Sequence, residues 1–485
     1  MKILFASSEL YPLIKTGGLA DVAVSLPAAL NALQQDIKIM MPGYRDALAS
    51  IDGAKPIATL SLADHTIALL YTSLPRAALE VWLVDHVLFD RPGNPYLAKN
   101  GAPWPDNAQR FALFNRAVAA VALGHANLDW QPDIVHCNDW QSALAPALLA
   151  SERWRPATVY TIHNLSYQGI FPQATYRELG LPNELWSVEG LEFYGQLSFM
   201  KGGLNFADRI STVSPGYARE IQTPEFGCGL EGLLKRRHAA LSGIVNGIDT
   251  DVWNPARDAF LIKNYDRENL KDKQANRSAL QRAFELPQQN KVALIGMIGR
   301  LVEQKGVDLL LNALPELIKL PVQIALLGAG QPEYEQALRG WSQRHPNQLG
   351  VRIGYDEVLA HRIEAGADMF LMPSRFEPCG LNQMYSQRYG TVPIVRRTGG
   401  LQDTVVDANA ENKKAGTATG LIFEEASGPA LVAAVRRALS LWEDSTVWRQ
   451  LMLTGMQQDF SWRHSAQQYL ALYRQALADR RSVCV

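Results

Sequence analysis

The stretch that decides the fold is Lys2-Ile3-Leu4-Phe5-Ala6-Ser7, followed by the loop Lys15-Thr16-Gly17-Gly18-Leu19-Ala20-Asp21. The first run is apolar and has the length of a buried strand. The glycine pair opens a segment that we expect to be helical from about Leu19 to Leu33, and a second strand is expected at Ile37–Met41. A strand, a glycine-containing turn, a helix and another strand indicate a parallel sheet with helical crossovers.

The same alternation continues along the chain and then starts again. Further strands are expected at Val81–Val84, Ile134–Cys137, Thr158–Ile162 and Ile210–Val213, and the pattern restarts at Val292–Ile298. Apolar strands that alternate with helices predict an α/β protein made of two doubly wound halves. The turn signal Asn246-Gly247 and the polar segment 257–291 lie between the halves. We expect a cleft between them, with ligands bound at the carboxyl ends of strands.

Composition excludes several classes of protein. The chain has 485 residues, of which 47% are hydrophobic and 20% charged, and this is typical of a folded globular protein. Its 47 basic and 48 acidic residues give no overall basic charge for nucleic acid or an anionic membrane. Four cysteines without a C-x-x-C pair favour a reducing compartment. The first apolar run is too short for a signal peptide, and no run approaches the length of a membrane helix, so we expect a soluble, cytoplasmic protein.

Two of the loops that follow strands carry cations. Lys15 stands beside the Gly17-Gly18 pair, where backbone amides and a helix N-terminus favour an anion. Arg300 and Lys305 flank one loop after the strand 292–298, and two fixed cations suit a pyrophosphate. Taken singly, each group could also be an ordinary turn or surface charge.

Three more loops add a carboxylate, a glycine pair and a histidine. Glu377 follows the strand expected at Met369–Met372, where a carboxylate could bind sugar hydroxyls or stabilise a cationic transition state. Arg396-Arg397-Thr398-Gly399-Gly400 again combines cations with a glycine pair. His163 follows the strand 158–162, and Asp139 holds a similar position after an earlier strand. Taken alone, Glu377 could be an acid at the start of a helix, and His163 could be a structural histidine.

Familiar cofactor and metal motifs do not match. The glycine loops fit neither a P-loop nor G-x-G-x-x-G, and the histidines lack the H-E-x-x-H spacing of a zinc site. Asp249-Thr250-Asp251 matches the short D-x-D pattern of metal-dependent glycosyltransferases, which occurs too often by chance to carry weight. A zinc site and a dinucleotide fingerprint therefore have no support from the residues.

The five loops together resemble glycosyltransferase family 5, the bacterial glycogen synthases and plastid starch synthases. The resemblance covers nearly the whole chain. It is carried by Lys15-Thr16-Gly17-Gly18-Leu19-Ala20-Asp21-Val22, Phe89-Asp90-Arg91-Pro92-Gly93, Thr161-Ile162-His163-Asn164-Leu165, Tyr167-Gln168-Gly169, Asn246-Gly247-Ile248-Asp249 and, most specifically, Pro373-Ser374-Arg375-Phe376-Glu377-Pro378-Cys379-Gly380-Leu381.

This resemblance implies a GT-B fold, in which two Rossmann-like domains face an inter-domain cleft. It implies an N-terminal domain over residues 1–245 on the acceptor side and a C-terminal domain over 246–457 on the nucleotide-sugar side. Residues 458–485 would form a helix that crosses back to the first domain. The implied activity is the retaining transfer of glucose from ADP-glucose to the non-reducing 4-OH of glycogen or another α-1,4-glucan primer.

The resemblance also implies roles for individual residues. Arg300 and Lys305 would stabilise the departing pyrophosphate, while His163 and Glu377 would act at the glucose. The other implied substrate-binding residues are Lys15, Gly18, Asp21, Asp139, Asn246, Tyr355, Cys379, Gly380, Leu381, Thr398, Gly399 and Gly400. Tyr355 would stack on adenine, and Thr398, Gly399 and Gly400 would present backbone amides to the donor.

Two other classes stay open from the residues. One is another GT-B transferase, of the sucrose- or trehalose-forming type or dependent on UDP-glucose, and the other is a non-catalytic glucan-binding protein. The preference for ADP- over UDP-glucose rests on resemblance. Oligomeric state, allosteric control and the natural primer have no signal in the sequence.

Overall fold

The computed structural model describes residues 1–74 and 77–484, and these form two compact units. Unit 1 comprises Met1–Gly247 together with the segment from Trp462 onward, and unit 2 comprises Ile248–Ser461. The chain thus leaves unit 1 once and returns to it with its last helix. Among the described residues no helix is long and apolar enough to cross a membrane.

Unit 1 is built on a sheet of nine described strands in the order β12-β11-β7-β6-β1-β2-β5-β4-β3. The strands from β12 to β5 pair in parallel, whereas β4 pairs antiparallel with both β5 and β3. Their bounds are β1 (Lys2–Ala6), β2 (Asp36–Pro42), β3 (Lys55–Leu62), β4 (His65–Leu74), β5 (Leu79–Asp85), β6 (Ile134–Asn138), β7 (Ala157–Ile162), β11 (Arg209–Thr212) and β12 (Leu241–Gly243). A small antiparallel sheet adds β8 (Ile170–Pro172), β9 (Glu192–Phe193) and β10 (Gln196–Ser198).

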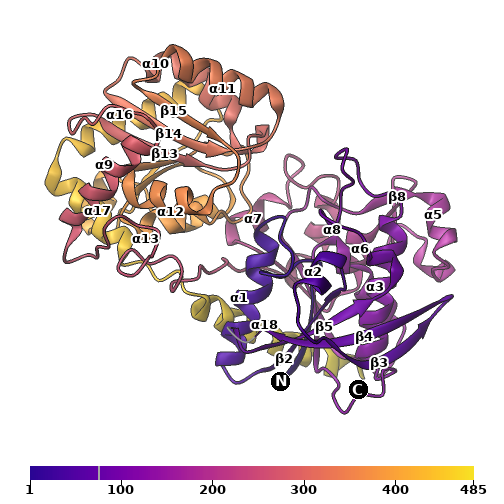
Figure 1. Cartoon of the computed structure of the whole chain (residues 1–485). Coiled ribbons are helices and arrows are strands. Elements are labelled where there is room, and N and C mark those ends of the chain that lie inside the picture. Colours follow the sequence, from indigo (N-terminus) through magenta and orange to yellow (C-terminus); the bar gives the residue numbers. More distant parts are fainter. Residues whose placement is uncertain (75–76, 485) are drawn as a thin grey trace. The chain divides into compact units, whose positions relative to one another are not determined.

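Helices cover this sheet, and the last one returns from unit 2 (Figure 1). They are α1 (Gly18–Ala32), α2 (Arg45–Ala49), α3 (Asn107–Ala122), α4 (Leu144–Ala150), α5 (Gln173–Glu178), α6 (Phe199–Phe206), α7 (Pro215–Glu220), α8 (Glu231–Arg236) and α18 (Trp462–Cys484). The His136 ring on β6 is fully buried, and its Nδ1 lies 2.8 Å from the hydroxyl of Tyr473 on α18. This hydrogen bond anchors the returning helix to the centre of the sheet.

Unit 2 is built on a parallel sheet of six strands, in the order β15-β14-β13-β16-β17-β18, counted over its residues 248–461. The strands are β13 (Ala293–Ile298), β14 (Val322–Gly328), β15 (Leu349–Ile353), β16 (Met369–Met372), β17 (Val392–Arg396) and β18 (Leu421–Phe423). The helices are α9 (Lys273–Ala283), α10 (Val307–Leu317), α11 (Pro332–Arg344), α12 (Glu357–Gly366), α13 (Asn382–Arg388), α14 (Gly399–Thr404), α15 (Ala410–Ala415), α16 (Gly428–Trp442) and α17 (Ser445–Met456).

The central strand β13 shows why unit 2 is doubly wound. Its side chains alternate between two apolar cores, with Ile295 and Met297 in one and Leu294 in the other. All three are nearly or completely buried, because helices cover both faces of the sheet. A continuous apolar run is therefore the sequence signature of this strand.

Strand order identifies one edge of each sheet as the place for a site. In unit 1, β1 lies between β2 and β6, and in unit 2, β13 lies between β14 and β16. The chain runs to one side of β1 or β13 first and later to the other. Loops that leave β1 and β6, or β13 and β16, therefore diverge at a topological switch point, where ligands of such sheets bind.

Candidate active-site residues

Glu377 lies in the loop that follows β16, at the switch point of unit 2. Its side chain is only 6% exposed, and its Oε2 accepts a hydrogen bond from the Lys305 Nζ at 2.6 Å. The hydroxyl of Ser374 donates to the same oxygen at 3.1 Å. The structure thus brings together two residues that were predicted independently from the sequence, in an ion pair whose carboxylate is buried and whose lysine is partly exposed.

Glycine permits the close approach of the two loops that make this pair. Lys305 is followed by Gly306, whose φ of +71° is in the left-handed region. A side chain on Gly306 would collide with the carbonyl oxygen of Pro373. The backbone N–H of Arg375 also donates to the carbonyl of Gln304 at 2.9 Å, so backbone as well as side-chain contacts join the loops.

Arg300 reaches the same loops through a neighbour. It follows β13 and is exposed, and its Nη2 donates to Gln304 Oε1 at 3.1 Å. The amide of Gln304 in turn contacts the carbonyl of Phe376 at 3.5 Å. Arg300 therefore stays accessible to an anionic ligand while its guanidinium is steered by Gln304.

The glycine pair before α14 packs against the Glu377 loop. The Gly400 N–H donates to the carbonyl of Glu377 at 3.0 Å, and a side chain on Gly400 would collide with the backbone of Cys379. Gly399 has a φ of +41°, and Thr398 is fully buried. The structure therefore brings these residues together, and it uses the Gly400 amide to hold the loop.

The remaining candidates of unit 2 differ in exposure. Cys379 is buried, Gly380 has a φ of +72°, and Leu381 immediately precedes α13. Tyr355 follows β15 and is 81% exposed, an unusual position for a large aromatic ring.

His163 follows β7 in unit 1 and is held by Asn138. The two residues meet at 3.0 Å between His163 Nε2 and Asn138 Oδ1. Asn138 Nδ2 donates to the carbonyl of Ala6 at 3.1 Å, which leaves Oδ1 as the atom facing the histidine. We therefore assign the proton to Nε2 of His163. Burial lowers the pKa of His163 to about 3, so the ring is neutral at physiological pH.

Asp139 follows β6 and supports the same histidine. Its φ of +55° is unusual for a residue other than glycine. Its Oδ1 accepts hydrogen bonds from the backbone N–H groups of His163 at 2.8 Å and Asn164 at 3.4 Å. Burial nevertheless raises the pKa of Asp139 to about 7, because it outweighs these two bonds. Asp139 thus positions the backbone of His163.

The Lys15 loop follows β1 on the same edge of the sheet. Lys15 Nζ lies 2.8 Å from Asp21 Oδ1, in an ion pair whose side chains are 39% and 33% exposed. A side chain built on Gly17 or Gly18 would meet no atom within 4 Å, and neither residue has a positive φ. Internal packing and backbone strain therefore do not require glycine here, which fits close approach by a ligand.

Asn246 lies near the end of unit 1, after β12. It is 6% exposed, and its Oδ1 is buried without a hydrogen-bond partner in the part of the chain that the structure describes. A buried acceptor of this kind is costly unless a partner arrives.

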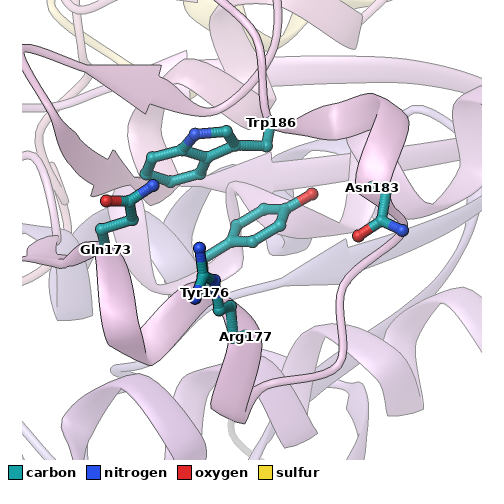
Figure 2. Close-up of a pocket in the computed structure, with 5 residues that line it drawn as sticks. All are labelled: Gln173, Tyr176, Arg177, Asn183 and Trp186. Carbon is teal, nitrogen blue, oxygen red and sulfur yellow. The ribbon is translucent and has the colours of Figure 1, made fainter.

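A small cavity of about 190 Å³ lies elsewhere in unit 1, between α5 and the segment that ends at Trp186 (Figure 2). Figure 2 shows the Trp186 indole beside the Tyr176 ring. The remaining lining residues are Gln173, Arg177 and Asn183. The sequence analysis selected none of these residues, and the candidate site does not include them.

Sequence reasoning missed the residues that hold the candidates in place. These are Asn138, Gln304 and Ser374. Each follows a strand or lies in a loop already selected, which is a usable signal. Within the described ranges, no cluster of three or more His, Cys, Asp or Glu residues is arranged to hold a metal ion.

Family models and curated relatives match most of the chain. The model "Starch synthase catalytic domain" matches residues 2–236, and "Glycosyl transferases group 1" matches residues 280–450. Glycogen synthase 1 of Methylococcus capsulatus is 56% identical over 100% of this chain and 98% of its own length. Glycogen synthase of Thioalkalivibrio sulfidiphilus is 52% identical over 98% of this chain and 99% of its own.

Two solved structures of glycosyltransferases match the chain over nearly its whole length. The catalytic domain of starch synthase IV from Arabidopsis thaliana, bound to ADP and acarbose, is 31% identical and matches with a TM-score of 0.86. The match covers 98% of this chain and 99% of that one. Sucrose-phosphate synthase from Thermosynechococcus elongatus, at 17% identity and a TM-score of 0.61 over 98% and 99% of the two chains, shares the fold. The predicted resemblance and the GT-B fold are confirmed, and the chain belongs to the starch and glycogen synthase family of glycosyltransferases.

Proposed function

We propose that the chain transfers glucose from ADP-glucose to the non-reducing 4-OH of an α-1,4-glucan, with retention of the anomeric configuration. The observation that carries the proposal is the Lys305–Glu377 ion pair, 2.6 Å long and placed at the switch point of unit 2. Curated glycogen synthases at about half identity over the full length support the same activity. The starch synthase relative that holds ADP and acarbose supports a nucleotide-sugar donor and a glucan acceptor.

The reaction breaks the bond between the anomeric carbon and the pyrophosphate oxygen. It forms a bond from that carbon to the acceptor oxygen, whose proton is lost, and ADP leaves with the bonding electrons. Negative charge grows on the pyrophosphate while positive charge grows on the sugar ring. A protein lowers the barrier by placing fixed opposite charges where these charges develop.

In our proposal, unit 2 supplies those charges. Arg300 and Lys305 bind the pyrophosphate, and Glu377 binds the glucose and stabilises positive charge on its ring. Tyr355 offers an exposed ring for adenine, and Thr398 and Gly399 offer backbone amides to the donor. The Gly400 amide is already bonded to Glu377, so Gly400 contributes by allowing close packing. Cys379, Gly380 and Leu381 shape the same loop.

We assign the acceptor side to unit 1, and we keep the domain limits of residues 1–245, 246–457 and 458–485 as predictions. His163, neutral and directed by Asn138, would form a hydrogen bond with a sugar hydroxyl. Lys15 and Gly18 would contact the donor phosphates, and Asp21, Asp139 and Asn246 would bind sugar hydroxyls. We expect the two units to serve the same reaction, without a metal or an organic cofactor.

The test is ADP release from ADP-glucose, measured with and without glycogen, with UDP-glucose in parallel. Glycogen-dependent release from ADP-glucose is the expected result. Release only from UDP-glucose would retain the transferase and overturn the donor. Silence with both donors, in folded protein, would overturn the transferase in favour of glucan binding without catalysis.

A further inference from the structure

The carboxylate of Glu9 is the centre of a hydrogen-bond cluster that none of the roles above includes. Glu9 follows β1 at the switch point of unit 1 and is 4% exposed. Its Oε2 accepts from the backbone N–H groups of Thr16 at 2.6 Å and Gly17 at 3.1 Å. Its Oε1 accepts from the Thr16 hydroxyl at 2.5 Å and the Tyr96 hydroxyl at 2.8 Å.

These hydrogen bonds attach the exposed turn at Thr16 and Gly17 to the buried Glu9 carboxylate. Lys15, Thr16, Gly17 and Gly18 are all exposed, and their glycines have no packing partner that would keep the turn in place. Glu9 engages the two amides that directly follow Lys15, so it fixes the backbone from which the Lys15 side chain starts. Hydrogen bonds to a charged acceptor are the stronger kind.

The cluster also connects two segments far apart in the sequence. Tyr96 donates to Glu9 and accepts a second hydrogen bond from the Ser8 hydroxyl at 2.7 Å. The Tyr96 ring packs with Phe111 of α3, at 6.0 Å between ring centroids. The anchor of the Lys15 turn is therefore itself tied to the core of unit 1.

We propose that Glu9 is a positioning residue, which holds the Thr16–Gly17 turn so that Lys15 and the N-terminus of α1 meet the donor phosphates. This inference rests on the proposed function for the role of Lys15. It does not require that Glu9 touch a substrate. If the proposal holds, Lys15 contributes much less to kcat/KM once Glu9 is replaced.

A double-mutant cycle between Glu9 and Lys15 tests this coupling. We expect Glu9→Gln to lower kcat/KM for ADP-glucose by roughly 30-fold, because the amide cannot accept at both atoms, and Lys15→Ala to lower it by roughly 100-fold. The double variant should lose little more than Lys15→Ala alone. Glu192→Gln is the matched control, because Glu192 also accepts a backbone N–H, that of Gly195 at 2.6 Å. Any fall in kcat/KM caused by Glu192→Gln should multiply with the fall caused by Lys15→Ala.

Trypsin cleavage after Lys15 reports the turn without any need for activity. Glu9→Gln should be cut there at least several-fold faster than the wild type, while cleavage after the exposed Lys319 of unit 2 stays the same. Thr16→Val removes one bond from the opposite side and should show both effects more weakly, and it replaces Glu9→Gln if that variant does not fold.

Both readouts must agree for the proposal to stand. Multiplicative losses in the Glu9–Lys15 cycle, or an unchanged cleavage rate after Lys15, would overturn it. If the wild-type protein released no ADP, the proposed function would fail, and the cleavage rate would then decide whether Glu9 holds the turn.

Discussion

The polar groups at the two switch points follow the same rule of placement and differ in charge. In unit 2, Glu377 meets Lys305 directly, so a buried carboxylate is paired with an ammonium whose side chain is 23% exposed. In unit 1, His163 and Asp139 are partly buried with amide and backbone partners, and neither forms an ion pair with a cation among the described residues. Burial therefore makes His163 neutral and raises the pKa of Asp139. The neighbouring loop, more than the position on the sheet, decides which partner each of these polar groups meets.

Glu377→Gln tests the charged side of this comparison and should have the largest effect. The variant keeps the shape of the side chain and removes its charge, so kcat should fall by about 10³-fold, as for loss of a preorganised charge in an active site. ADP release with saturating glycogen measures it, and circular dichroism checks the fold. Glu316→Gln is the control, because Glu316 forms an exposed ion pair with Lys319 in the same unit. Turnover near that of the wild type would remove Glu377 from the mechanism.

Lys305→Ala removes the other member of the pair and should rank second. It takes a cation from the pyrophosphate and leaves Glu377 with the Ser374 hydroxyl as its remaining side-chain partner among those described here. We expect kcat to fall by about 10²-fold. Lys319→Ala, which breaks the exposed pair with Glu316, should leave kcat unchanged. Equal effects of the two lysine variants would mean that the place of the Lys305–Glu377 pair at the switch point has no catalytic value.

Asp139→Asn tests the neutral side through pH. The pKa of Asp139 in the folded protein is about 7, above its usual 3.8, so the folded state binds more protons than the unfolded state between these values. The free energy of unfolding therefore falls as pH rises from about 4 to 7. Asparagine keeps the Oδ1 acceptor but does not titrate. The Asp139→Asn variant should therefore not lose this part of the free energy of unfolding as pH rises.

We expect the melting temperature of the wild type relative to Asp139→Asn to drop by roughly 5 °C between pH 4.5 and 8. His163, whose pKa is lowered, contributes the opposite slope, so the difference between the two proteins isolates Asp139. Differential scanning calorimetry makes the measurement. A difference that does not change with pH would show that Asp139 is ionised throughout.

Tyr473→Phe should have the smallest effect and should be confined to unit 1. It removes the hydroxyl that bonds His136 Nδ1 and leaves that buried nitrogen without this partner. The expected cost is about 1–2 kcal/mol in the free energy of unfolding of unit 1, with kcat unchanged. Urea unfolding measures it, with Tyr194→Phe as a control because Tyr194 is 79% exposed. Equal stabilities would mean that α18 is held by apolar contacts instead.

Much of the fold was predictable because buried parallel strands leave a continuous apolar run. The strands expected near residues 3, 134 and 295 are present as β1, β6 and β13 with small shifts at their ends. The antiparallel pair of β3 and β4 was missed, because β3 and β4 mix exposed and buried residues and lack such a run. The small sheet of β8, β9 and β10 was missed because its strands have only two or three residues.

The site was predictable in its members and less so in its connections. Lys305 and Glu377 were each selected as loop residues after strands, but they are 72 positions apart, and their contact depends on β13 and β16 being neighbours. Glu9 follows β1, but the sequence did not indicate its partners, since its donors lie 7, 8 and 87 positions away and one of them is an ordinary tyrosine.

The sequence by itself determined the alternation of strands and helices, the chemistry of each loop and the family resemblance, because these depend on local periodicity and on residue type. The tertiary structure alone decided which loops meet, which carboxylate is paired and which is not, and that His163 is neutral with its proton on Nε2. These properties depend on strand order and on burial. Both are set by the packing of the whole core and are not encoded in any single stretch of the chain.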